Sequence, residues 1–168
     1  LSEVYLGLGS NLGDRRQNIA VALGQVRKLS SGLAVSALYE TSPVGFTGQP
    51  AFMNAVCGIW TRLGPFELLK ELKEIQASLA GRPAFVNGPR TLDVDILVCG
   101  RRVLSTPGLT IPHPRMAERV FVLAPLAEIA PGLQHPVLRE SVRSLLLRLR
   151  SSGAPTAPLS SLAIGRVS

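Results

Sequence analysis

The order in which strand-type and helix-type segments alternate is the feature that most narrows the fold of this chain. Continuous or alternating apolar runs predict strands, whereas apolar residues spaced three and four apart predict helices. The predicted strands lie at 3–8, 33–40, 52–62 and 88–97, with one helix after the first strand and another after the third. From residue 3 to residue 97 the predicted order is therefore β-α-β-β-α-β.

Local signals mark the ends of both predicted helices. Asp14 and Gln17 have the spacing of a capping box, and Pro65 suits the first turn of the second helix. Gly81 suits the C-terminal cap of that helix. The apolar stripes expected to face the core are Ile19, Leu23, Val26 and Leu29, followed by Phe66, Leu69, Leu72, Ile75 and Leu79.

The β-α-β-β-α-β order is the split pattern of ferredoxin-like folds, so we predict an α/β (α+β) core with a mainly antiparallel sheet flanked by helices. Residues 112–130 predict helical turns broken by Pro125. Residues 136–150 predict an extra basic, amphipathic C-terminal helix that docks on the core, with membrane-surface contact as the alternative. We expect one domain over 1–150 and a mobile tail, rich in Ser, Pro and Ala, over 151–168.

The positive charge of the chain is concentrated in its second half. The formal net charge is +7, of which residues 1–80 contribute +1 (7 Lys/Arg, 6 Asp/Glu) and residues 81–168 contribute +6 (11 Lys/Arg, 5 Asp/Glu). A basic surface predicts a polyanionic partner such as a nucleotide, a nucleic acid or an acidic membrane. Only three aromatic residues follow Trp60, fewer stacking groups than a binder of single-stranded nucleic acid needs.

The two cysteines, Cys57 and Cys99, lie far apart in apolar runs and form no CxxC pair. This pattern favours reduced core thiols over a disulfide or a metal site, and with them a cytoplasmic location. No apolar stretch approaches the ~20 residues of a membrane-spanning helix, and no signal-peptide pattern is present at the N-terminus. We therefore expect no membrane partner.

The predicted strand that ends in "TLDVDIL" carries two aspartates within an apolar run. Side chains alternate between the two faces of a strand, so Leu92, Val94 and Ile96 share one face. Asp93 and Asp95 share the other face, roughly 6.6–7 Å apart along the strand. Two carboxylates at this spacing can bind a hard cation such as magnesium. The alternative is a polar, solvent-facing side of an antiparallel sheet.

Cationic side chains lie close to these aspartates in the sequence. Arg90 precedes Asp93 by three residues, and Arg82 lies at the end of the preceding predicted helix. His113 is held between two prolines, with Arg119 six residues further on. Guanidinium and imidazole groups can bind phosphate charge that a cation leaves uncovered. Taken singly, each of them is as readily a solvated surface residue.

The glycine-rich stretch "GLGSNLGD" lies between a predicted strand and a predicted helix. Its position is typical of phosphate-binding loops, but it lacks the residue spacing of the Walker A loop and of the dinucleotide-binding fingerprint. The alternative is a tight turn in which the Asn11 side chain bonds to backbone groups. The residues alone leave both interpretations open.

Four motifs in this order resemble the 6-hydroxymethyl-7,8-dihydropterin pyrophosphokinase family of folate biosynthesis. The motifs are "YLGLGSNLGDR", "ETSPVGF…QPAFMNAV", "GPRTLDVDIL" and "IPHPRMAERVFVLAPLAEIAP", and the resemblance covers about residues 4–132. It implies an enzyme that transfers pyrophosphate from ATP to the hydroxymethyl oxygen of the pterin and releases AMP. It also implies dependence on magnesium, with two ions bound.

The resemblance assigns expected roles to individual residues. Asp93 and Asp95 are the expected magnesium ligands, and Arg82 and Arg90 match the catalytic-loop arginines. The positions that match ATP contacts are Gln76, Ile96, Thr110, His113 and Arg119. The positions that match the pterin site are Thr41, Pro43, Val44, Phe52, Asn54 and Phe121.

The residue types at the pterin positions suit a flat heteroaromatic ring. Phe52 and Phe121 could sandwich the ring, although aromatic residues at such positions are more often simple core packing. Asn54 and the backbone groups of 41–44 could meet the amide and amino edge of the pterin.

In one loop the chain departs from the family's pattern. The family has Arg-Trp-Gly-Pro-Arg before the aspartates, whereas this chain has Asn87 in place of Trp and Val86 in place of the adjacent Arg. The departure leaves the chemistry in place and bears on pterin affinity. We expect the loops 41–51 and 82–89 to move on ligand binding, with Phe85 a candidate to replace the Trp.

Two alternatives to an active pyrophosphokinase follow from the residues. One is a weakly active relative that binds pterin or nucleotide, given the altered loop. The other is a basic nucleic-acid-binding module of the same fold, but paired carboxylates at Asp93 and Asp95 would repel a phosphate backbone. The resemblance favours the enzyme, with ATP and the pterin as partners, no nucleic acid, and a monomer as the expected state.

Overall fold

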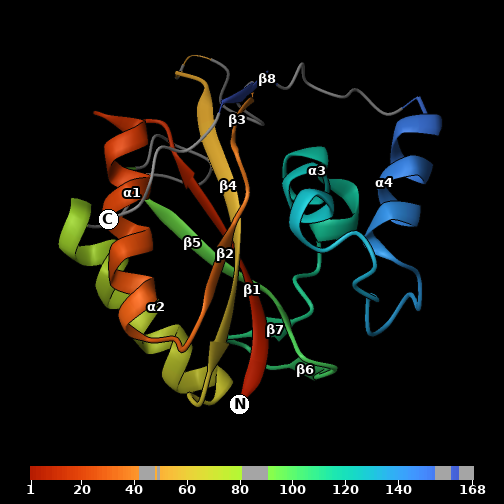
Figure 1. Ribbon diagram of the computed structural model, residues 1–168, viewed down its shortest axis with the longest axis horizontal. Coiled ribbons are helices and arrows are strands. Elements are labelled where there is room, and N and C mark those ends of the chain that lie inside the picture. The colour runs from red at the N-terminus through yellow and green to blue at the C-terminus, as the bar shows by residue number, and fades with distance from the viewer. Residues whose placement is uncertain (42–47, 49, 81–90, 154–159, 163–168) are drawn as a thin grey trace.

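The structure is a computed structural model that describes residues 1–41, 48, 50–80, 91–153 and 160–162 (Figure 1). Within these residues the helices are α1 (Arg15–Lys28), α2 (Pro65–Ala80), the short 3-10 helix η1 (Met116–Glu118), α3 (Val120–Ile129) and α4 (Val142–Ser151). The strands of the same residues are β1 (Ser2–Ser10), β2 (Leu33–Val35), β3 (Leu38–Thr41), β4 (Phe52–Thr61), β5 (Asp93–Cys99), β6 (Leu104–Ser105), β7 (Thr110–Ile111) and β8 (Ser160–Leu162).

β1 lies inside the main sheet, between β4 and β5, and pairs antiparallel with both. Among the described residues the strand order is β5-β1-β4-β3-β8, and β2 also pairs with β4. The first four strands of this order, with α1 and α2 as the connecting helices, are the ferredoxin-like arrangement. The predicted α/β fold with an antiparallel sheet flanked by helices is therefore confirmed.

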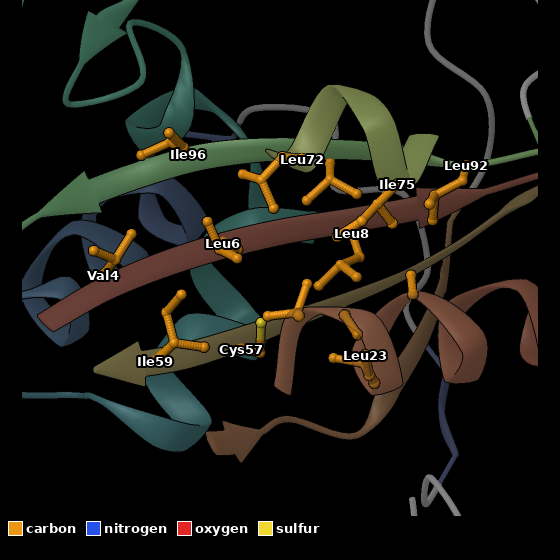
Figure 2. Close-up of a cluster of buried hydrophobic side chains, with 14 of the residues drawn as sticks. Val4, Leu6, Leu8, Leu23, Cys57, Ile59, Leu72, Ile75, Leu92 and Ile96 are labelled. Atoms are coloured by element: carbon orange, nitrogen blue, oxygen red, sulfur yellow. The ribbon is translucent and has the colours of Figure 1, made fainter. Parts of the chain in front are cut away.

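Helices cover both faces of the sheet (Figure 1). α1 and α2 pack on one face, where Leu6 and Leu8 of β1 meet Leu23 of α1 and Leu72 of α2 (Figure 2). α3 packs on the other face against β4 and β3, and α4 packs on α3. A fully buried leucine contributes roughly 1.5–3 kcal/mol relative to an exposed one. The alternate residues of β1 thus anchor the core under α1 and α2.

Helix capping and the apolar stripes follow the sequence with one exception. The predicted start of α1 is confirmed, because Oδ1 of Asp14 accepts a hydrogen bond from the N–H of Gln17 at 3.1 Å. In α2 the prediction for Phe66 is wrong, since this side chain is 54% exposed. Leu68 faces the core instead, because residues four and seven positions further along share its face of the helix. Gly81 lies outside the described residues.

The single strand predicted over residues 33–40 is two strands, β2 and β3. Both pair with β4, but Val35 lies opposite Cys57 and Tyr39 opposite Asn54, so the interval of four residues on one side faces three on the other. Ser36 fills the irregularity: its Oγ accepts from the N–H of Val56 at 2.9 Å. A buried hydroxyl that bonds to the neighbouring strand marks a bulge that hydrophobic alternation does not reveal.

The prediction that Pro125 breaks the helical turns of residues 112–130 is wrong for α3. The helix runs from Val120 to Ile129 with Pro125 inside it. A proline in a helix interior removes one hydrogen bond and costs about 3 kcal/mol or more. Burial of Val122, Leu123 and Leu126 between the sheet and α4 offsets this cost, since each buried apolar side chain contributes roughly 1.5–3 kcal/mol.

The C-terminal helix begins later than predicted, at Val142 instead of residue 136. Ser141 is its N-cap and accepts from the N–H of Ser144 at 3.1 Å. Before it, Nδ1 of His135 accepts from the N–H groups of Val137 and Leu138 at 3.2 and 3.0 Å. Local side-chain acceptors of this kind compete with helical hydrogen bonds, which explains the late start.

The docked interpretation of this amphipathic helix is confirmed. Its buried residues, Val142, Leu145 and Leu146, belong to the apolar cluster that also contains α3. None of the helices in the described part of the chain combines the length and the apolar character needed to cross a bilayer.

The tail contains one described strand. Ser160–Leu162 form β8, which pairs antiparallel with β3. Over these three residues the chain is a sheet strand. Most of residues 154–168 lie outside the described part of the chain, so the mobile tail predicted over 151–168 stays a prediction. Pairing with β8 satisfies N–H and C=O groups that an edge strand would otherwise leave to solvent.

We expect Gly24→Ala to stabilise the protein. Gly24 lies inside α1, and a methyl group added at its Cα would have nothing within 4 Å. Alanine restricts the unfolded chain more than glycine does, so the free energy of unfolding should rise by about 0.4–1 kcal/mol. Urea denaturation would measure the change. A decrease in stability would contradict the open packing at this position.

Protonation of His135 should destabilise the fold. Burial lowers the pKa of His135 below its ordinary value of 6.5. The neutral ring accepts hydrogen bonds from the N–H groups of Val137 and Leu138, and protonation of Nδ1 would break both bonds. A lowered histidine pKa gives stability that is fully present above pH 6.5 and is lost as the pH falls toward the folded-state pKa. Urea denaturation between pH 7 and pH 5 should therefore show a smaller pH-dependent loss in His135→Asn than in the wild type; equal losses would refute this role.

Candidate active site

The two aspartates of β5 and Asn54 of β4 share one face of the sheet, whereas Ile96 faces the core under α1 and α2. In the strand register Gly9 of β1 lies opposite Asp93 of β5 and opposite Asn54 of β4, and Gly7 lies opposite Asp95. Because residues two apart share a face, both aspartates and Asn54 lie on the side that faces away from α1 and α2. The predicted alternation of β5 is confirmed, since the aspartates are half-buried while Val94 is buried in the core.

Charges of both signs meet beside the aspartates. Burial lowers the pKa of His113, the positive charges of Arg119 and Arg115 lower it further, and Asp93 acts in the opposite direction. Burial also lowers the pKa of Arg119, with Arg115 acting in the same direction and Asp95 and Asp93 opposing it. Two cationic-type side chains therefore lie within electrostatic reach of the paired carboxylates, as the sequence predicts.

Two hydrogen bonds hold His113 in place. Its backbone N–H donates to the carbonyl oxygen of Leu97 in β5 at 2.8 Å, and its Nδ1 accepts from the N–H of Arg115 at 3.1 Å. With Nδ1 as an acceptor, the proton of the neutral ring resides on Nε2. His113 can therefore offer an Nε2–H donor at the site.

A pocket of about 260 Å³ adjoins Asp95. It brings together three of the predicted ATP residues, Ile96, Thr110 and His113. The other lining residues are Leu69, Lys73, Val94, Asp95, Pro107, Gly108, Leu109 and Pro114. Lys73 of α2 is a cation that the sequence reasoning missed. Its spacing of four from Leu69 places the two side chains on one helix face, but only the packing of α2 beside β5 brings that face to the pocket.

Gln76, another predicted ATP residue, has a backbone partner in the structure. Its Oε1 accepts from the N–H of Val94 at 3.2 Å, which ties α2 to β5 between the two aspartates. β5 is the end strand of the sheet among the described residues, so this side chain satisfies an N–H on its open edge. A direct role of Gln76 toward ATP stays a prediction.

The predicted pterin residues that the structure describes lie on neighbouring strands and on α3. Thr41 ends β3 and lies opposite Phe52 at the start of β4. Nδ2 of the buried Asn54 donates to Oγ1 of the buried Thr41 at 2.9 Å. Phe121 lies near the start of α3, with the guanidinium carbon of Arg119 5.4 Å from the centre of its ring, a cation–π contact.

Several predicted site residues fall outside the described part of the chain. They are Pro43, Val44, Arg82 and Arg90, together with Phe85, Val86 and Asn87 of the unusual loop. Their expected roles, and the expected movements of loops 41–51 and 82–89, stay predictions.

The glycine-rich stretch of residues 7–14 is part of β1 and of the turn that follows it. Asn11 is buried, and its Nδ2 donates to the carbonyl oxygen of Pro50 at 3.1 Å. This supports the interpretation of a turn in which Asn11 bonds to backbone. The partner is 39 residues away in the chain, however, and not within the turn itself.

A ferredoxin-like sheet that carries paired carboxylates, cationic side chains and an adjoining pocket has the features of a phosphate-transferring enzyme. The family model described as "7,8-dihydro-6-hydroxymethylpterin-pyrophosphokinase (HPPK)" matches residues 5–131. The chain belongs to this family, which uses ATP as a co-substrate. The resemblance stated from the motifs is thereby confirmed.

Similar proteins agree with this assignment. The 2-amino-4-hydroxy-6-hydroxymethyldihydropteridine pyrophosphokinase of Bacillus subtilis is 49% identical over 133 residues, which cover 77% of this chain and 79% of that protein. The folic acid synthesis protein FOL1 of Dictyostelium discoideum is 41% identical over 150 residues, 89% of this chain. This chain spans only 23% of the length of that protein. It spans 19% and 21% of the folic acid synthesis proteins fol1 of Pneumocystis carinii and Schizosaccharomyces pombe.

Solved structures share the fold. The wild-type HPPK-DHPS of Plasmodium falciparum with pteroate superposes with a TM-score of 0.74 at 18% sequence identity, covering 89% of this chain and 42% of that one. At this identity the likeness bears on the fold alone.

We expect Gly9→Ala to weaken pterin binding while ATP binding is retained. A Cβ at Gly9 would lie 3.0 Å from Oδ1 of Asn54 and 3.7 Å from Phe52, so Asn54 would have to shift by a few tenths of an ångström. If this shift weakens the hydrogen bond between Asn54 and the ligand by about 1 kcal/mol, binding of 6-hydroxymethyl-7,8-dihydropterin should be roughly fivefold weaker. Calorimetric titration would measure it.

The matched control is Gly24→Ala, the same substitution at a position with open space around it. Equal pterin affinity in Gly9→Ala and the wild type would show that the bare backbone at Gly9 is not needed for the pterin site.

Proposed function

We propose that this chain transfers the pyrophosphate group of ATP to the hydroxymethyl oxygen of 6-hydroxymethyl-7,8-dihydropterin and releases AMP. One observation carries the proposal. On one face of the sheet, Asp93 and Asp95 of β5 are separated from the pterin-type residues of β4 only by the glycines of β1. Because Gly7 and Gly9 have no side chains, ATP phosphates held beside the aspartates and a pterin ring held beside β4 could approach each other across β1.

The two aspartates suit magnesium ions. Both carboxylates are half-buried on one face of β5, and each lies opposite a glycine, so no side chain of β1 crowds them. Within the described residues no group of three or more His, Cys, Asp or Glu side chains could hold a metal. Magnesium bound to nucleotides takes one or two protein carboxylates and completes its shell with water and phosphate oxygens. We propose that Asp93 and Asp95 hold two ions, which when bound neutralise charge on the phosphates.

The cationic side chains would hold the triphosphate. Nε2–H of His113 and the guanidinium of Arg119 can donate to phosphate oxygens next to the aspartates. We propose that Ile96 and Thr110 contact the nucleotide in the pocket beside Asp95, that Gln76 supports it through β5, and that Arg82 and Arg90 act on the phosphates as catalytic arginines. Their common task is to keep the chain of phosphates in line with the attacking hydroxyl.

The pterin would bind on the same face of the sheet, beside β4 and the end of β3. Nδ2 of Asn54 is engaged with Thr41, which leaves Oδ1 to accept from the amino edge of the ring. The Thr41 hydroxyl accepts that bond and can donate its own proton to the pterin. We propose that Phe52 and Phe121 contact the two faces of the ring and that Pro43 and Val44 line its edge.

Several broader predictions accompany this function. We propose that residues 1–150 act as one unit, as a monomer in the cytoplasm, with ATP and the pterin as its ligands. The family assignment does not favour the nucleic-acid-binding alternative.

We expect Asp95→Asn to abolish most of the activity. The amide keeps the size of the side chain but loses the negative charge that a magnesium ion requires. AMP formation from ATP, magnesium and 6-hydroxymethyl-7,8-dihydropterin should fall by about 100-fold or more, the loss of roughly 3 kcal/mol of transition-state stabilisation. Asp14→Asn is the matched control, because Asp14 caps α1 with a side-chain oxygen that asparagine also provides.

Two results would separate the alternatives. If Asp95→Asn formed AMP as fast as the wild type, the proposed metal role would be wrong. If the wild type bound ATP tightly but formed no AMP from it in the presence of magnesium and the pterin, the chain would be the weakly active relative that its altered loop allows.

A further inference from the structure

Arg15, the first residue of α1, joins the two ends of the chain segment that connects β3 to β4. Its Nη1 lies 3.2 Å from Oε1 of Glu40 and donates to the carbonyl oxygen of Ala51 at 2.7 Å. Glu40 immediately precedes Thr41, and Ala51 immediately precedes Phe52. Nη1 of Arg15 carries two hydrogens and therefore bridges Glu40 and Ala51. These are the residues that precede Thr41 and Phe52, two of the proposed pterin-binding residues.

A second contact from the same turn reaches the same place. Nδ2 of Asn11, which is only 1% exposed, donates to the carbonyl oxygen of Pro50 at 3.1 Å. The turn that carries Asn11 is itself braced, because Nδ2 of Asn18 donates to the carbonyl oxygen of Leu12 at 2.9 Å and lies 3.2 Å from Oγ of Ser10. The start of α1 is thus tied to the backbone at two consecutive residues before β4.

We infer that Arg15 and Asn11 are positioning residues of the pterin site. They hold the end of β3 and the start of β4 at a fixed separation, and Thr41, Phe52 and Asn54 depend on that separation. The inference rests on the proposed function, since it assigns to these two residues a part in recognising the pterin. Neither of them needs to touch the ligand.

The energetics favour positioning over a role in overall stability. The side chains of Arg15 and Glu40 are 25% and 39% exposed, and a partly exposed ion pair contributes little to folding. The hydrogen bond between Asn54 and Thr41, in contrast, is buried and is sensitive to small displacements of either strand. Loss of the bridge should therefore change ligand affinity more than it changes the melting temperature.

Arginine suits this task better than lysine does. The planar guanidinium directs its donors at fixed angles, so the carboxylate of Glu40 and the carbonyl of Ala51 are held in a defined relation. A lysine ammonium retains the charge but directs its donors from a single flexible point. Arg15→Lys is consequently an intermediate test that preserves the charge.

The experiment measures AMP formation against pterin concentration at saturating ATP and magnesium. For Arg15→Ala and Asn11→Ala we expect KM for the pterin to rise about tenfold, as loss of a hydrogen bond to a charged or buried group produces, with kcat at saturating pterin within about threefold of the wild type. Arg15→Lys should raise KM about threefold. The Kd of a non-hydrolysable ATP analogue should stay unchanged in all three variants.

The matched control is Arg16→Ala, which removes the neighbouring, exposed arginine of the same helix turn. It should leave KM, kcat and ATP affinity at the wild-type values. If an alanine variant failed to fold, Arg15→Lys and Glu40→Gln, which keep a hydrogen-bonding group at the bridge, would supply the comparison of KM.

Two outcomes would overturn the inference. One is an unchanged KM for the pterin in Arg15→Ala and Asn11→Ala. The other is a parallel loss of pterin binding, ATP binding and melting temperature, which a merely structural role would give. Failure of the proposed function looks different, because the wild type itself would then form no AMP. In that case calorimetric titration of the pterin with the ATP analogue and magnesium present would compare wild type and variants, and equal Kd values would refute the positioning role.

Discussion

The pairing of β1 with β4 on one side and β5 on the other is the constraint on which the rest of the structure depends. Its register places Leu6 and Leu8 in the core under α1 and α2, and Gly7 and Gly9 on the opposite face. Because strand side chains have a period of two, a slip of one residue would bring the glycines into the core and the leucines onto the site. Burial of these leucines therefore also determines the geometry of the candidate active site.

The same register explains how the candidate site divides into two halves. Asp93 and Asp95 come from β5, whereas Asn54 and Phe52 come from β4, and the strand between them presents hydrogen atoms instead of side chains. The end of β3 and the start of β4, which carry the proposed pterin-binding residues, are tied to the start of α1 by Arg15 and Asn11. The glycine-rich motif thus contributes to the site through the backbone shape of β1 and through the contact of Asn11 with Pro50.

Particular residues show where sequence reasoning succeeded and where packing overruled it. Alternation over residues 92–96 was readable because side chains of a half-buried strand have a period of two, and the cap at Asp14 was readable because its partner is three residues away. The helix interrupted at Pro125 was a wrong prediction, since burial of the neighbouring side chains outweighs the proline. Phe66 was wrong because several faces of an apolar-rich helix fit the period, and only the position of the sheet selects one.

By itself, the sequence determined the order of strands and helices, the face on which the two aspartates lie and the family to which the chain belongs. These depend on short-range periodicity and on motifs of adjacent residues. Only the tertiary structure decided that Lys73 lines the pocket, that Arg15 bridges Glu40 and Ala51, and that Asn11 bonds to Pro50. Those contacts join residues that are far apart in the chain, and they exist because the sheet order and the helix packing bring the partners together.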